Sequence, residues 1–179
     1  MINKIIQLIE KDQVCIKALE CVNFLRLPQC YIAAGFVRNL VWDSLHNKKI
    51  PTALNDVDVI YYDANESNEN AYLKYESQLS SLMPDLNWQV RNQAKMHLRN
   101  GDDPYLDVID AMSYWPEKET AVAIRKLDNH DYECVSAFGF DTLFDLKVSH
   151  NPRRTKAVFK DRLTSKQWLD RWPKLIIIS

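Results

Sequence analysis

Apolar positions recur along the chain with two spacings, one typical of helices and one typical of strands. Near the N-terminus they recur every three or four residues, as at Ile5, Leu8 and Ile9, which places them on one face of a helix. Around positions 55–62, β-branched and aromatic residues cluster as in a strand. The helical spacing predicts one or two helices over 2–25, then helices over 36–46, 71–83, 108–114, 141–148 and a last one through 168 and 169; strand-like runs cover 30–34, 55–62, 88–96, 121–127, 132–136 and 175–178.

Turn and capping signals separate these predicted elements. Pro28 ends the first helical region, residues 128–131 join two strands in a turn, and residues 164–167 have the spacing of a capping box before the last helix. The order mixes helices and strands without regular βαβ alternation, which predicts an α+β fold with a mixed sheet. We expect a single domain over 1–179, with an N-terminal helical segment (1–27) and a basic C-terminal segment (147–179).

The composition favours a soluble protein. Hydrophobic residues make up 46% and charged residues 26% of the chain, and no apolar run is long enough to cross a bilayer, so no membrane contact is expected. The four cysteines form no CxxC pair and lie among apolar residues. We therefore expect reduced, buried thiols and a cytoplasmic location.

Charge is unevenly distributed along the chain although the net charge is only −1. Positions 56–76 hold six acids and one base, whereas positions from 147 onward hold nine bases and two acids. Such a distribution suits a metal-complexed polyphosphate substrate, but two oppositely charged solvated surfaces explain it equally well. On the first interpretation, some of Arg153, Arg154 and Lys156 line or border the acidic cleft, or else contact an anionic partner.

Asp56 and Asp58 are the first candidates for chemistry. Two acids at positions i and i+2 of a strand project from the same face and can share a cation such as Mg²⁺. A solvated strand end is the alternative, and the apolar residues Val57, Val59 and Ile60 argue against it by fixing the strand.

Gly35 separates a predicted strand from a predicted helix, where backbone N–H groups can bind phosphate. Arg38, one turn into that helix, would add a bidentate phosphate contact. An ordinary strand-to-helix turn is the alternative. The chain has only three glycines, so neither a GxGxxG motif nor a P-loop is present.

Taken together, these motifs resemble a known family. Residues 34–40 and 55–59 are similar to the glycine turn, helix and Asp-x-Asp strand of polymerase-beta-type nucleotidyltransferases, in particular the opening motif of CCA-adding enzymes. More closely, the segments 35–46, 54–63, 88–97, 114–125, 138–152 and 166–175 resemble a bacterial family of small nucleotidyltransferase-like proteins.

The resemblance implies a polymerase-beta-type fold and a two-metal reaction that uses Mg²⁺ or Mn²⁺. It assigns Asp56 and Asp58 as catalytic metal ligands. The nucleotide-binding residues that it implies are Gly35, Phe36, Arg38, Asn39, Arg91 and Asn92.

Two positions depart from the family pattern. Phe36 stands where the superfamily usually has glycine or serine, and the predicted strand over 88–96 lacks the third carboxylate that many members carry. Asp107 or Asp110 would supply that acid by folding back, or both residues simply begin a helix.

The implied activity is transfer of a nucleoside monophosphate from a nucleoside triphosphate to an acceptor hydroxyl that the sequence does not identify. A tRNA acceptor is not expected, because CCA-adding enzymes normally carry a long helical RNA-binding tail. A nucleotide-binding or regulatory module without transfer chemistry is the second hypothesis, and a metal-dependent phosphohydrolase is the third.

Overall fold

A five-stranded mixed sheet forms the centre of the protein, whose computed structural model describes residues 1–129 and 131–179. The expected turn residue His130 lies outside the described residues. The strand order is β3-β2-β1-β4-β5; β2 and β3 run parallel, and the other neighbours run antiparallel. The strands are β1 (Tyr31–Ala33), β2 (Val57–Tyr61), β3 (Trp88–Asn92), β4 (Val122–Lys126) and β5 (Tyr132–Ser136).

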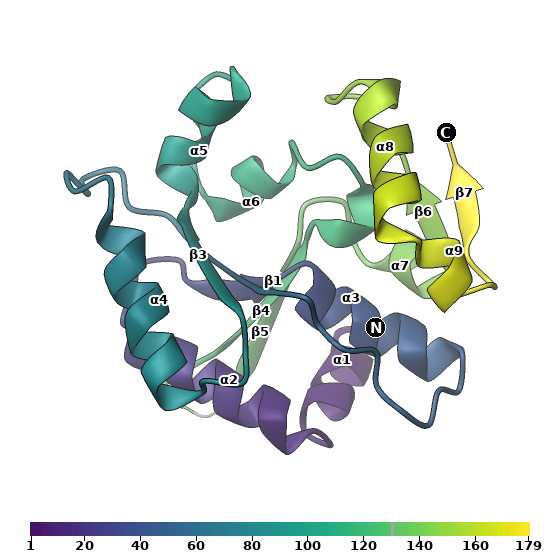
Figure 1. The fold of residues 1–179 in the computed structure, drawn as a ribbon, viewed down its shortest axis with the longest axis horizontal. Helices are drawn as coiled ribbons and strands as arrows, with labels where there is room; N and C mark the ends of the chain where they lie inside the picture. Colours follow the sequence, from purple (N-terminus) through teal and green to yellow (C-terminus); the bar gives the residue numbers. More distant parts are fainter. Residues whose placement is uncertain (130) are drawn as a thin grey trace.

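Helices flank this sheet on both sides, which confirms the predicted α+β fold (Figure 1). A small parallel sheet of β6 (Lys147–Ser149) and β7 (Ile176–Ile178) lies near the C-terminus. No helix among residues 1–129 and 131–179 is long and apolar enough to span a membrane. The helices are α1 (Ile2–Ile9), α2 (Gln13–Phe24), α3 (Gly35–Leu45), α4 (Ala71–Leu82), α5 (Gln93–Asn100), α6 (Val108–Met112), the 3-10 helix η1 (Lys118–Thr120), α7 (Asp141–Phe144), α8 (Lys156–Lys166) and α9 (Trp168–Arg171).

The two faces of the sheet are covered unequally. Val57, Val59 and Tyr61 of β2 belong to the larger hydrophobic core, which also includes α1, α2 and buried residues of α3 and α4. Ile60 lies between Val59 and Tyr61, so its side chain points to the opposite face of the sheet, where it belongs to a smaller cluster with Val108 and Met112 of α6. Because side chains alternate along a strand, Asp58 projects to the side of Ile60, where the covering is thinner.

Two predicted elements end earlier than the periodicity indicated. The predicted strand over 88–96 stops at Asn92, because the Asn92 side chain accepts a hydrogen bond from the Ala94 N–H (3.1 Å) and begins α5 there. The predicted helix over 141–148 stops at Phe144, and Leu146 takes a left-handed φ of 57° before β6.

The C-terminal segment contains a helix that the hydrophobic pattern did not reveal. α8 begins at the N-cap residue Thr155 and buries only Phe159, so its apolar periodicity is weak. The predicted capping box was wrong, since residues 164–166 form the last turn of α8. Gln167, at a left-handed φ of 50°, then separates α8 from α9.

Candidate active site

The start of β2 brings Asp58 to a pocket of about 240 Å³. Asp56 precedes β2 and Asp58 is its second residue, so both lie on the same side of the strand. β1 pairs with β2 so that Ile32 faces Val59, which sets the end of β1 beside the start of β2. The pocket is lined by Asp58, Ala34, Gln89, Arg91, Trp115 and Arg162, among others.

Asp58 is the most perturbed carboxyl group of this pocket. Burial, followed by the neighbouring charge of Asp56, raises the pKa of Asp58 to about 6 from its usual 3.8. Arg38, Lys166 and Arg162 oppose this rise electrostatically. A divalent cation between the two acids would relieve both the repulsion and the desolvation.

The position opposite Asp58 on β3 is occupied by an amide and not by an acid. Gln89 pairs in register with Asp58, and its Nε2 donates to Asp56 Oδ2 over 3.3 Å. Asp107 and Asp110 do not fold back: Asp107 accepts from the Asp110 N–H (2.7 Å) and Asp110 accepts from the Leu106 N–H (3.0 Å) at the start of α6. The interpretation of both as helix-start residues is confirmed.

The strand-to-helix turn needs its glycine for space and not for a positive φ. Ala34, and not Gly35, adopts the positive φ, at 53° with ψ −117°. A Cβ on Gly35 would stand 3.4 Å from Arg38 Nη2 and 3.6 Å from Leu54 Cδ2, so the glycine permits close packing. Phe36 is 3% exposed and packs in the larger core, which leaves only its backbone near the turn.

Arg38 is buried and is not among the residues that line the pocket. It is 8% exposed, its guanidinium carbon stands 5.2 Å and 4.9 Å from the ring centroids of Trp42 and Trp168, and its Nη2 donates to Asn39 Oδ1 (3.0 Å). Burial lowers the pKa of Arg38 to about 10, and Glu117 raises it. Arg38 is therefore a buried cation near the acids at neutral pH.

Arg91 and Asn92 are held by contacts within the protein. Arg91 Nη1 pairs with Glu76 Oε1 (2.6 Å), and the guanidinium lies over the Tyr72 ring. Asn92 Nδ2 donates to Asp63 O (2.8 Å) and to Glu66, while its Oδ1 caps α5. Arg91 lines the pocket with its guanidinium turned to Glu76, and the Asn92 amide anchors the loop after β2.

The C-terminal segment contributes a different arginine from those expected. Arg154 forms a bidentate ion pair with Asp102 and borders an adjoining pocket, whereas Arg153 Nη1 donates to Ser113 Oγ (2.6 Å). Arg162 of α8 lines the pocket that holds Asp58. Arg162 is not among the predicted site residues, because the hydrophobic pattern gives no sign of the helix that carries it.

The acids alone do not enclose a metal ion. No group of three His, Cys, Asp or Glu side chains suited to a metal occurs within the described part of the chain, 1–129 and 131–179. Asp56 and Asp58 nevertheless provide the carboxylate oxygens that Mg²⁺ prefers, and this ion usually takes waters and substrate phosphates as its other ligands. The pair fits a hard divalent cation that is completed by substrate.

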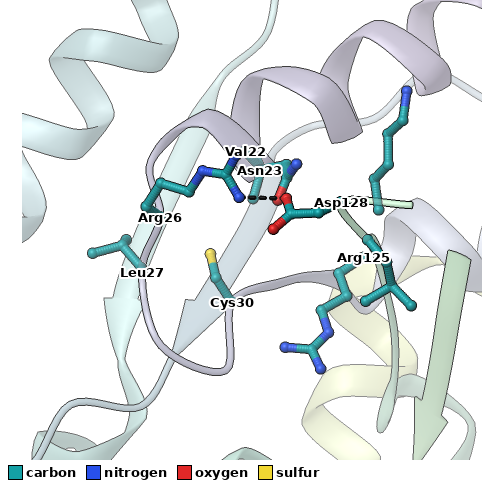
Figure 2. A pocket seen from close by; sticks show the side chains of 9 residues that line it. Val22, Asn23, Arg26, Leu27, Cys30, Arg125 and Asp128 are labelled. Carbon is teal, nitrogen blue, oxygen red and sulfur yellow. Dashed lines mark hydrogen bonds and ion pairs between the residues drawn. The ribbon is translucent and has the colours of Figure 1, made fainter. Parts of the chain in front are cut away.

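A second pocket, of about 270 Å³, lies elsewhere in the molecule and holds none of the predicted site residues. Its lining comes from the end of α2 and the residues after it, from Cys30, and from residues 125–128 at the end of β4 (Figure 2). The residues from the first of these regions are Val22, Asn23, Arg26 and Leu27.

Comparisons with known proteins agree with the fold and the motifs. A family model described as nucleotidyltransferase matches residues 20–177. The structure resembles an NMR structure described as revealing a CCA-adding enzyme head domain, with TM-score 0.85 and 28% identity over 98% of this chain and 94% of that chain. It also shares its fold with a CCA-adding enzyme solved with CTP, at TM-score 0.60 and 12% identity, covering 98% of this chain and 43% of that one. No curated protein sequence matches the chain.

Proposed function

The chain belongs to the nucleotidyltransferase family, and from that premise we propose that it transfers a nucleoside monophosphate from a nucleoside triphosphate to an acceptor hydroxyl. The observation that carries the proposal is the pair Asp56 and Asp58 on one side of β2, beside the Ala34–Gly35 turn. The similarity to a CCA-adding enzyme head domain, and the CTP in a more distant relative, support a nucleotide substrate.

In the proposed reaction, the acceptor oxygen bonds to the α-phosphorus while the bond from that phosphorus to the bridging oxygen of pyrophosphate breaks. The acceptor proton passes to water, and pyrophosphate leaves. Bound Mg²⁺ or Mn²⁺ would neutralise phosphate charge and polarise the α-phosphoryl group. Asp56 and Asp58 would hold that ion, and their shared position on β2 would fix its place relative to the turn.

The remaining predicted residues have different roles in this proposal, from phosphate contact to support of the surrounding loops. The backbone N–H groups of Gly35 and Phe36 begin α3 and suit contact with phosphate oxygens. Arg38 supplies positive charge near the acids, and Asn39 holds its guanidinium by accepting a hydrogen bond from Nη2. Arg91 shapes the pocket wall while paired with Glu76. Asn92 supports the site by anchoring the ends of β3 and the loop after β2.

The test is a screen of the purified protein with each labelled nucleoside triphosphate, Mg²⁺ or Mn²⁺, and candidate acceptors. Labelled product together with pyrophosphate is the expected result, and we expect none with a tRNA transcript as acceptor. The double variant Asp56→Asn/Asp58→Asn is the control. Equal pyrophosphate release by the wild type and the double variant would contradict the role of these acids.

A nucleotide-binding module without transfer chemistry is the second candidate. Gln89 favours it, because an amide stands opposite Asp58 on β3 where a third acid would complete the site. In that case the wild type binds Mg²⁺ and nucleoside triphosphate, releases no pyrophosphate with any acceptor, and loses binding when Asp58 becomes Asn.

A further inference from the structure

Helix α8 brings to the pocket an arginine that differs in exposure from Arg38. Arg162 lines the same pocket as Asp58, whereas Arg38 is buried in the helix that follows the turn at Ala34. Arg38 is 8% exposed and packs between two tryptophans, whereas the Arg162 side chain is 34% exposed and lines the pocket. Of the two, Arg162 is therefore the one that can reach a ligand without rearrangement of the core.

Glu117 fixes one edge of the Arg162 guanidinium and leaves the rest available. Arg162 Nε donates to Glu117 Oε1, and Glu117 is fully buried with its Oε2 accepting from Thr120 Oγ1 (3.2 Å). Within residues 1–129 and 131–179, neither terminal nitrogen of Arg162 donates a hydrogen bond to the protein. A guanidinium held at Nε presents its two Nη groups as a fixed pair of donors.

Tryptophan packing determines where α8 stands. Trp168 and Trp172, which follow α8, contact Trp42 of α3 edge to face, with ring centroids 6.0 Å and 5.1 Å apart. Trp172 Nε1 also donates to the buried Asp43 Oδ1 over 2.7 Å. The C-terminal end of α8 is thus fixed to the same helix that begins at Gly35, which fixes Arg162 relative to the turn and the acids.

We propose that Arg162 binds the β- and γ-phosphates of the nucleoside triphosphate and that Glu117 is the residue that positions it. This inference rests on the proposed function. Arginine suits these groups because its planar fork donates to two phosphate oxygens at once. In the transfer step, Arg162 would neutralise negative charge on the pyrophosphate as the α–β bond breaks.

The direct test measures affinity by titration calorimetry in Mg²⁺, with inorganic tripolyphosphate, an α,β-methylene nucleoside triphosphate and the matching monophosphate. Arg162→Gln should weaken binding of tripolyphosphate and the triphosphate analogue at least about tenfold and change monophosphate binding less than about twofold. The tripolyphosphate affinity of Arg162→Lys should fall between those of the wild type and Arg162→Gln, because lysine keeps the positive charge but lacks the two-donor fork of the guanidinium. Lys160→Gln, an equal charge change on the exposed side of the same helix, should have no effect.

Circular dichroism of each variant distinguishes lost contact from lost folding. Equal weakening of triphosphate and monophosphate by Arg162→Gln, or no weakening of either, overturns the proposal. Absence of tripolyphosphate binding by the wild type overturns it as well.

The role of Glu117 is tested by a double-mutant cycle. Glu117→Gln should weaken tripolyphosphate binding in the wild-type background and add little to Arg162→Gln, because it acts through Arg162. A residue with only a structural role would instead lower stability and affinity equally in both backgrounds, which would contradict the assignment.

The inference and the proposed function fail separately. If no acceptor yields product but tripolyphosphate binding depends on Arg162, the proposed transfer reaction is wrong and the proposed phosphate site is supported. If nucleotide transfer depends on Asp58 while Arg162→Gln leaves phosphate affinity unchanged, the reaction stands and the phosphate site is wrong.

Discussion

Two pockets of similar volume adjoin the central sheet, and their acidic groups differ. The pocket of Asp58 extends from the start of β2 to Gln93 and Met96, after the end of β3, whereas the second lies where α2 and β4 end. In the second pocket the basic residues each have an acidic partner. Arg26 pairs with Asp128 (Figure 2). Arg125 pairs with Glu133 (2.6 Å) and Lys126 with Glu20 (2.7 Å), two acids that lie outside the pocket lining.

The Asp58 pocket differs in its acids and not in its arginines. Arg91 and Arg162, which line it, also pair with acids, Glu76 and Glu117. Within residues 1–129 and 131–179, however, no ion pair involves Asp58 or the neighbouring Asp56, whose charges repel each other. The Arg26–Asp128 pair is mostly exposed, so solvent screens it, while Asp58 is partly buried and its pKa is raised. Pocket volume alone therefore does not identify a functional site. Partly buried acids without a paired cation, such as Asp58, are a better indicator of one.

The largest expected difference is between substitutions of the two aspartates, Asp58→Asn and Asp128→Asn. In an assay of pyrophosphate release, Asp58→Asn should lower the rate at least about a thousandfold, a loss of about 4 kcal/mol of transition-state stabilisation. Asp128→Asn should leave it within about twofold, because Asp128 lies at the other pocket.

Thermal unfolding gives the matching stability measurement. Asp58→Asn should leave the metal-free fold intact or slightly more stable, since it removes repulsion, and should abolish the stabilisation by Mg²⁺ plus nucleoside triphosphate. If Asp58→Asn and the wild type bind the nucleotide equally, with turnover in neither, the site is a metal-independent binding module.

A smaller difference concerns pH. Because the pKa of Asp58 is about 6 in the folded protein and 3.8 ordinarily, the folded state binds the additional proton between these values. Protonation of Asp58 therefore adds to the free energy of unfolding below about pH 4, and this contribution is lost as the pH rises through about 6. Binding of Mg²⁺ plus nucleoside triphosphate needs the ionised acid, so affinity should fall about tenfold per pH unit below pH 6.

The second pocket should contribute nothing to this profile. Burial raises the pKa of the Cys30 thiol to about 12, and the hydrogen bond from Arg26 lowers the pKa of Asp128 below its usual 3.8, so neither group titrates near pH 6. Denaturant unfolding from pH 4 to 7 checks the stability term, and the same series with Asp58→Asn should lose the pH dependence assigned here. A profile unchanged by that substitution would show that another group titrates.

The smallest expected effect tests the turn beside the acids. Ala34 holds φ 53° and ψ −117°, a conformation that glycine adopts with less strain. Ala34→Gly should therefore raise the free energy of unfolding by about 0.5–1 kcal/mol, and Ala34→Val should lower it, because a β-branched residue is more strained there. Chemical denaturation measures both, and destabilisation by Ala34→Gly would show that the Ala34 side chain matters more than its backbone.

Local pattern in the sequence was sufficient for most elements and for the two acids. The runs around Val57 and Ile60 indicated a strand, and the i, i+2 spacing of Asp56 and Asp58 placed both acids on one of its faces, because strand periodicity is a property of the backbone itself. The family resemblance, the α+β class and the mixed sheet are confirmed. The catalytic and binding roles stay predictions.

The partners of these residues were decided by tertiary structure. Nothing within the sequence around Arg38 indicates that Trp168, 130 positions later, would cover it, or that Arg162 would reach the pocket with Asp58. The weakly amphipathic α8 gave no periodic signal of its own, and its position depends on the packing of Trp168 and Trp172 against Trp42. Hydrophobic periodicity reports which face of an element is buried, whereas the identity of the residue that covers it is set by long-range packing.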